Sequence, residues 1–125
     1  MTTLAQRRYQ QNTHLHSSPV LQVAQILDVM ALHILDAKKA IEHHRIADRF
    51  EATEKASKLL LGLSSLWSQG VKDLQVNDLL QFMSDFEISL TLGLLEINEK
   101  NDLVLCEKAY ENTKAVALLW RNKSI

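Results

Sequence analysis

Residues that interrupt helices are scarce in this chain. Its 125 residues include a single proline, Pro19, and three glycines, Gly62, Gly70 and Gly93. Proline removes a backbone donor and clashes with the preceding helical turn, and glycine costs up to ~1 kcal/mol in a helix interior. Apolar residues recur at spacings of three and four along most of the chain, which is the period of an amphipathic helix. The sequence therefore predicts an all-α fold.

The Ser18-Pro19 step divides the chain into two parts. Serine is a favoured N-cap residue, and proline at the first helical position loses no useful N–H group. The residues before this step are polar and show no helical periodicity, whereas apolar residues dominate from Val20 onward. We therefore expect a flexible N-terminal leader over residues 1–17 and one domain over residues 18–125, which is a typical domain length.

Four amphipathic helices are expected in this domain. The first helix should run from residue 19 to about 42–45, the second over about 47–68 with the break at Gly70, and the third over about 75–98. A turn capped by Asn101 or Asp102 should precede the fourth helix. Because the connections have only a few residues, successive helices should be antiparallel. The expected architecture is an up-down-up-down four-helix bundle.

The third helix carries more apolar surface than a four-helix bundle needs. One stripe on it has the spacing of a core face, and a second stripe lies on the opposite side, formed by Ile88, Leu92 and Leu95. A bundle helix needs one apolar face, and an exposed apolar strip commonly marks a binding site. The alternative is a structural bundle that associates with itself, or with an additional helix, through this second stripe.

The fourth helix has small residues at the centre of its apolar stripe, Ala109, Thr113 and Ala117. Small side chains between larger ones predict a shallow trough rather than a ridge. This trough and the second stripe of the third helix are two candidate grooves, because a partner helix binds by laying its own apolar face in such a groove.

No pattern of residues indicates a catalytic, metal or cofactor site. Di-iron bundles need Glu-x-x-His pairs, and none of the five histidines has an acidic residue three positions before it. Glycine-rich phosphate loops and nucleophile elbows do not occur. Cys106 lies on an apolar stripe without nearby basic groups, so we expect a small buried side chain. We expect a protein that is not an enzyme and has no cofactor or metal.

His33 suggests a rival function. Histidine phosphotransfer domains are also small four-helix bundles, and they present an exposed histidine followed closely by lysine and a small residue. His33 is followed instead by Ile34 and Leu35, and Lys38 stands five positions on. We interpret His33 as solvated surface, and a phosphotransfer-type signalling bundle remains an alternative function.

Charge and hydropathy favour a cytoplasmic protein that binds no nucleic acid and inserts into no membrane. The net charge is -1 and gives no basic stripe for nucleic acid. No apolar signal core follows Arg7 and Arg8, and no run approaches the ~20 apolar residues of a membrane span. The single cysteine cannot form an internal disulfide, which suits a reducing compartment.

Several positions of the chain share a common register with one known family. The segment YQQNTHLHSSP, residues 9–19, has the tyrosine, the glutamines and the Ser-Pro step of the leaders in that family. Further matches are Asp28, AKKAI over residues 37–41, Lys55-Ala56, Asn98, Asp102 and Trp120. Over most of its length the chain resembles the FliS family of flagellar secretion chaperones. It departs from the family in the third helix, where Glu87 and Ser89 lie in a stretch that contains tyrosines in the family.

This resemblance implies a cytosolic, ATP-independent chaperone of bacterial flagellum biogenesis. Such a chaperone binds the disordered C-terminal segment of flagellin, prevents its premature polymerisation and helps deliver it to the type III export apparatus. The family receives that segment as helices and extended linkers in apolar grooves, and the leader can cover part of the empty site. The partner-binding residues expected here are Tyr9, Ile88, Leu92, Leu95, Ala109, Thr113 and Ala117.

Overall fold

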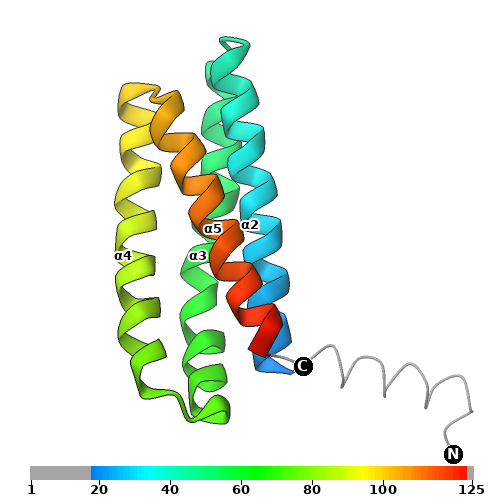
Figure 1. Ribbon diagram of the computed structural model, residues 1–125. Helices are drawn as coiled ribbons and strands as arrows, with labels where there is room; N and C mark the ends of the chain where they lie inside the picture. Colours follow the sequence, from blue (N-terminus) through cyan, green and yellow to red (C-terminus); the bar gives the residue numbers. More distant parts are fainter. Residues whose placement is uncertain (1–17, 124–125) are drawn as a thin grey trace, which may run out of the picture.

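The computed structural model describes residues 18–123, which form four antiparallel helices (Figure 1). The helices are α2 (Pro19–Glu42), α3 (Ile46–Leu74), α4 (Asn77–Lys100) and α5 (Leu103–Lys123). Each helix packs against the one before it, and α5 closes the ring by packing against α2. The predicted all-α, up-down four-helix bundle is confirmed.

The turns between the helices are short, and each contains one residue in the left-handed conformation. His44, Gln75 and Asn101 have φ values of 58°, 56° and 54°. Such a residue commonly ends a helix, and asparagine adopts this conformation more readily than most. Asn101 therefore closes α4, while the Asp102 carboxylate caps α5 by accepting a hydrogen bond from the Leu105 N–H at 3.0 Å.

The prediction that Gly70 ends the second helix is wrong. Helix α3 continues through Gly70 to Leu74. A Cβ atom at Gly70 would lie 2.6 Å from Cζ3 of Trp120 on α5, which is closer than van der Waals contact allows. Gly70 is therefore a packing site for an indole ring, and the favourable packing offsets the low helix propensity of glycine.

The core is centred on α2. Ten of the 24 residues of α2 are buried, against α3 on one side and α5 on the other. Trp120 is fully buried, and its Nε1–H donates a hydrogen bond to Met83 Sδ at 3.1 Å. Within residues 18–123, α2 is the one helix long and apolar enough to cross a membrane by length and composition. Its place at the centre of the core accounts for that composition.

Helix α4 is the least buried part of the bundle. It has 24 residues, as α2 has, but buries only five of them: Leu79, Met83, Leu90, Leu94 and Ile97. It stands at one edge of the bundle in Figure 1, and its packing against α3 and α5 is much sparser than that of α2. The surface left open by this sparse packing is the candidate functional site.

Candidate functional site

The second apolar stripe of α4 faces away from the bundle. Ile88, Leu92 and Leu95 are 59%, 61% and 63% exposed. Their spacing of four and three residues puts them in one row on the helix, opposite the core positions Leu90, Leu94 and Ile97. The expectation that these three side chains are left over from the core is therefore confirmed, and they form a continuous apolar row on the outside.

A groove of about 330 Å³ runs between α3 and α4 beside this row. Its lining residues are Leu60, Leu61, Ser64, Glu87, Ile88, Thr91 and Leu92. Ser64 Oγ donates a hydrogen bond to the Glu87 carboxylate across the seam, which holds the two helices together at this level. Two members of the exposed row therefore form one wall, and α3 supplies the other.

Leu61 is the exposed apolar residue of this groove that was not predicted from the sequence. It is 81% exposed, the highest value for a large apolar side chain within residues 18–123. The signal was present in the run Leu59-Leu60-Leu61, because consecutive helical side chains point about 100° apart and cannot all face one core. Leu60 is buried, and Leu61 turns outward beside α4.

A second, narrower groove of about 150 Å³ separates α4 from α5. It is lined by Phe86, Ser89, Leu90, Gly93, Leu105, Lys108, Ala109 and Asn112. A Cβ atom built on Gly93 would meet no atom within 4 Å, so the groove is open at this position. This site was not predicted from the sequence, although Ser89 and Gly93 are two small residues one turn apart on the same helix face.

The expected trough on the fourth helix is not an open surface. Ala109, Thr113 and Ala117 are only 7%, 0% and 1% exposed, so the expectation that they form an accessible groove is wrong. Small residues on a helix let the neighbouring helices approach closely, and here the bundle itself fills the trough. Of the three residues, Ala109 borders an accessible groove, the one between α4 and α5.

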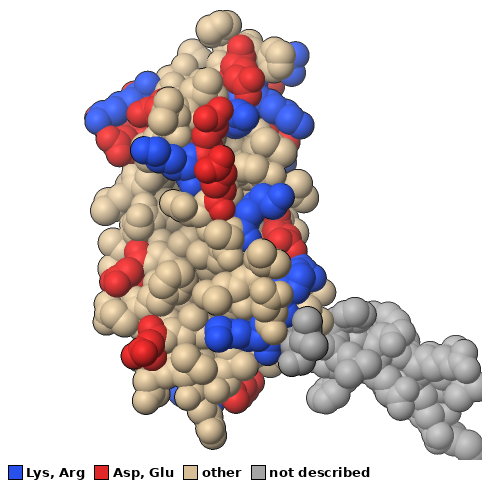
Figure 2. Space-filling model, in the orientation of Figure 1, with Lys and Arg blue, Asp and Glu red and all other residues tan. Residues whose placement is uncertain are grey.

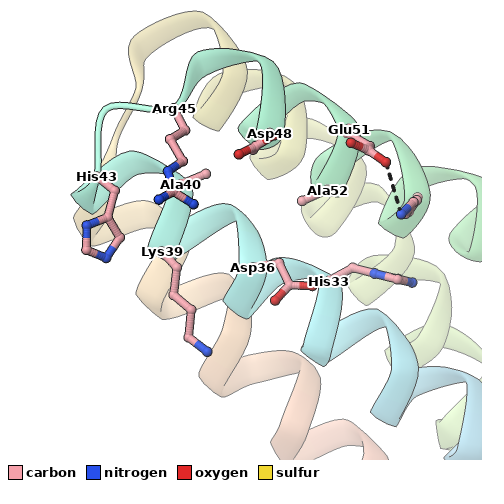
Figure 3. Close-up of a pocket in the computed structure, with 10 residues that line it drawn as sticks. His33, Asp36, Lys39, Ala40, His43, Arg45, Asp48, Glu51 and Ala52 are labelled. Atoms are coloured by element: carbon pink, nitrogen blue, oxygen red, sulfur yellow. Dashed lines mark ion pairs between the residues drawn. The ribbon is translucent and has the colours of Figure 1, made fainter.

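A polar cleft of about 300 Å³ lies between the end of α2 and the beginning of α3 (Figure 3). Residues of α2, among them His33 and Asp36, form one side of the cleft, and α3 forms the other, where Glu51 forms an ion pair with Lys55 at 3.2 Å. The cleft is lined by His33, Asp36, Lys39, Ala40, His43, Arg45, Asp48, Glu51, Ala52 and Lys55, so both signs of charge are mixed.

This cleft has no arrangement that indicates metal binding. No cluster of three or more His, Cys, Asp or Glu side chains with metal-binding geometry occurs in residues 18–123. His33 is half-buried in the cleft wall, so it is less exposed than the solvated surface position that the sequence suggests.

Cys106 is a buried thiol, as its place on the apolar stripe predicts. Its side chain is fully enclosed, and Sγ donates a hydrogen bond to the Ile34 carbonyl at 3.4 Å. Burial raises the pKa of the Cys106 thiol to about 11. The thiol is therefore protonated and unreactive at neutral pH, since the thiolate is the nucleophile.

Tyr9, the remaining predicted site residue, lies outside the residues that the structure describes. Comparison of the whole chain with protein-family models, with curated proteins and with solved structures finds no match.

Proposed function

We propose that this protein is a cytosolic flagellar export chaperone of the FliS type, which holds the disordered C-terminal segment of flagellin before export. One support is the register of the leader, AKKAI and Trp120, which resembles that family. The observation that carries the proposal is the unburied apolar surface of α4: a row of three side chains more than half exposed, with a groove on each side of the helix.

This surface has the form that an amphipathic client helix requires. Such a helix presents apolar residues at i, i+3, i+4 and i+7, and Ile88, Leu92 and Leu95 offer the complementary row at i, i+4 and i+7. Apolar surface left exposed on a monomer is otherwise an aggregation hazard, so a transient occupant is a physical reason to keep it.

The energetics favour a client that extends along more than the row itself. Burying the exposed part of three Leu or Ile side chains contributes roughly 3–5 kcal/mol, taking ~1.5–3 kcal/mol for each complete side chain. Ordering a disordered segment costs roughly 2–5 kcal/mol or more. The row alone therefore barely offsets the ordering cost. A client segment that also enters the grooves between α3 and α4 and between α4 and α5 gains the additional contact area.

The direct test is titration of the full-length protein with a peptide from the C-terminal segment of flagellin. We expect binding heat in isothermal titration calorimetry and a gain of helical signal in far-UV circular dichroism beyond the sum of the free components. At protein and peptide concentrations of tens of micromolar, a complex with a binding free energy of ~7 kcal/mol or more is detectable. If no binding heat and no gain of helicity are measured there, the proposed client is wrong.

A pair of glycine variants tests whether the groove between α4 and α5 takes part. In Gly93→Leu the new side chain projects into that groove, whereas in Gly62→Leu, on α3, it projects into open solvent away from both grooves. Both changes raise helix propensity by up to ~1 kcal/mol, so both proteins should be at least as stable as the wild type.

The two variants should differ in binding. We expect Gly93→Leu to weaken flagellin binding by about tenfold or more, equivalent to ~1.4 kcal/mol, and Gly62→Leu to bind like the wild type. Equal affinity in all three proteins would show that the client does not use the groove between α4 and α5.

A further inference from the structure

Acidic residues are concentrated on the same helix that carries the exposed apolar row. From residue 77 to residue 99 helix α4 contains five acidic residues and no lysine or arginine, namely Asp78, Asp85, Glu87, Glu96 and Glu99. All 14 lysines and arginines lie elsewhere in a chain whose net charge is only -1. The single basic residue of α4 is its last one, Lys100.

These carboxylates lie next to the apolar row. Asp85 precedes Ile88 by three residues, Glu96 follows Leu92 by four, and Glu99 follows Leu95 by four, so each is a neighbour on the helix surface. Figure 2 shows red side chains without blue ones in the middle and lower part of the left edge, along α4, whereas both colours occur together at the upper end.

Only part of this negative charge is compensated within the bundle. Glu96 pairs with Lys100 at 2.6 Å. Asp85 accepts a hydrogen bond from the neutral Gln81 amide at 2.8 Å, and no ion pair forms at Asp85 or Glu99 within residues 18–123. The apolar row is therefore bordered by two exposed carboxylates that form no ion pair within the described residues, Asp85 and Glu99, and by Glu96, which is partly exposed and paired with Lys100.

We propose that the outer face of α4 binds a basic amphipathic helix, whose apolar stripe covers Ile88, Leu92 and Leu95 and whose lysines or arginines lie against Asp85, Glu96 and Glu99. The inference rests on the proposed chaperone function for the idea of a helical client, and it adds the charge of the helix that is selected. Complementary charges at the rim speed association and reject wrongly charged partners more than they raise affinity.

The same charges argue against two other occupants. A second copy docked through α4 by two-fold symmetry would bring its own Asp85, Glu96 and Glu99 against the same carboxylates of the first copy. Like charges that face each other across an interface are unfavourable. An anionic membrane surface attracts basic segments and repels a carboxylate-bordered face. A basic helix satisfies both the apolar row and its border.

The test uses two synthetic peptides of ~18 residues, which suffices for five helical turns. They share one apolar stripe and differ only in flanking residues, lysine in one and glutamate in the other. Fluorescence anisotropy with the full-length protein at ~50 mM salt should show at least about tenfold tighter binding of the lysine peptide, and the preference should shrink at ~300 mM salt because exposed charges are screened. Equal binding of both peptides, or no binding of either, overturns the proposal.

Charge-reversal variants assign the preference to this face. The double variant Asp85→Lys/Glu96→Lys should bind the glutamate peptide more tightly than the lysine peptide. The control Asp36→Lys/Glu111→Lys has the same change in net charge, at exposed positions on α2 and α5. This control should still bind the lysine peptide more tightly. If both double variants respond alike, the preference reflects net charge only and the proposal fails. A dimer of the wild type in sedimentation equilibrium that Leu92→Asp dissociates would identify a second copy as the occupant and would equally overturn it.

The outcome is separable from that of the proposed function. Failure of the flagellin segment to bind while the lysine peptide binds with the expected charge dependence refutes the flagellin client and leaves the basic-helix site standing. If the flagellin segment binds but the two synthetic peptides bind equally, the basic-helix site is refuted and the flagellin client is supported.

Discussion

Replacement of Gly70 by alanine tests the packing of α5 against α3. The added Cβ would lie 2.6 Å from Cζ3 and 3.1 Å from Cη2 of Trp120. The indole is fully buried and tied to Met83 by a hydrogen bond, so it has no free space into which to move. Overpacking a buried site costs ~1–3 kcal/mol, while Gly→Ala in a helix gains up to ~1 kcal/mol. We expect Gly70→Ala to lower the free energy of unfolding by about 1 kcal/mol.

The matched control is Gly62→Ala on the same helix. A Cβ at Gly62 meets no atom within 4 Å, so only the propensity gain remains and the free energy of unfolding should rise by ~0.5–1 kcal/mol. Urea unfolding followed at 222 nm should therefore separate the two alanine variants by about 2 kcal/mol, which corresponds to roughly 6–10 °C in melting temperature for a domain of this size.

A double variant isolates the contact. Trp120→Phe lacks the ring atoms that would collide with the new Cβ, although it leaves a cavity of its own. In the Trp120→Phe background, Gly70→Ala should be neutral or stabilising, and the double-mutant cycle gives the energy of the collision. If Gly70→Ala stabilises the wild-type background as much as Gly62→Ala does, then Trp120 does not pack on Gly70 and the reasoning is refuted.

Three further predictions follow from burial. Leu92→Asp should change the free energy of unfolding by no more than ~0.5 kcal/mol, because Leu92 is 61% exposed. Calorimetry should show that its affinity for flagellin falls about tenfold. Equal losses of unfolding and binding free energy would place Leu92 in the core. Burial raises the pKa of the Cys106 thiol from 9.0 to about 11, so the thiol of the unfolded chain loses its proton at a lower pH than that of the folded protein. The free energy of unfolding should therefore decline between pH 9.0 and about 11. Urea titrations at pH 8 and 10.5 should show this decline in the wild type, and the part due to Cys106 should be missing in Cys106→Ala. Deletion of residues 1–17 should leave the melting temperature within ~2 °C, because every buried core residue described lies at position 20 or later; a collapsed transition would show that those residues stabilise the bundle.

Local sequence signals were sufficient for most of the fold. Pro19 at the first helical position, Asp102 as the cap of α5 and the repeated spacing of apolar residues each act within a few turns, so they can be recognised without knowledge of the neighbours. The error at Gly70 arose because helix propensity and packing compete there. Only the position of Trp120, 50 residues later in the chain, decides between them.

The candidate site was predictable to a smaller extent. The outward direction of Ile88, Leu92 and Leu95 follows from helical geometry once the core face of α4 is known. The accessibility of Thr113 and Ala117 does not, because a row of small residues is either an open trough or the seat of a neighbouring helix. The packing of the bundle closed that trough.

The amino-acid sequence alone determined the number of helices, the start of α2 at Pro19, the cap of α5 and the surplus of apolar residues on α4, because these depend on interactions between residues a few positions apart. Only the tertiary structure decided which of those residues meet water. Exposure depends on how closely neighbouring helices approach, and α4 packs sparsely against both of its neighbours, while α2 is enclosed by α3 and α5. The two grooves beside α4 exist because of that difference in packing.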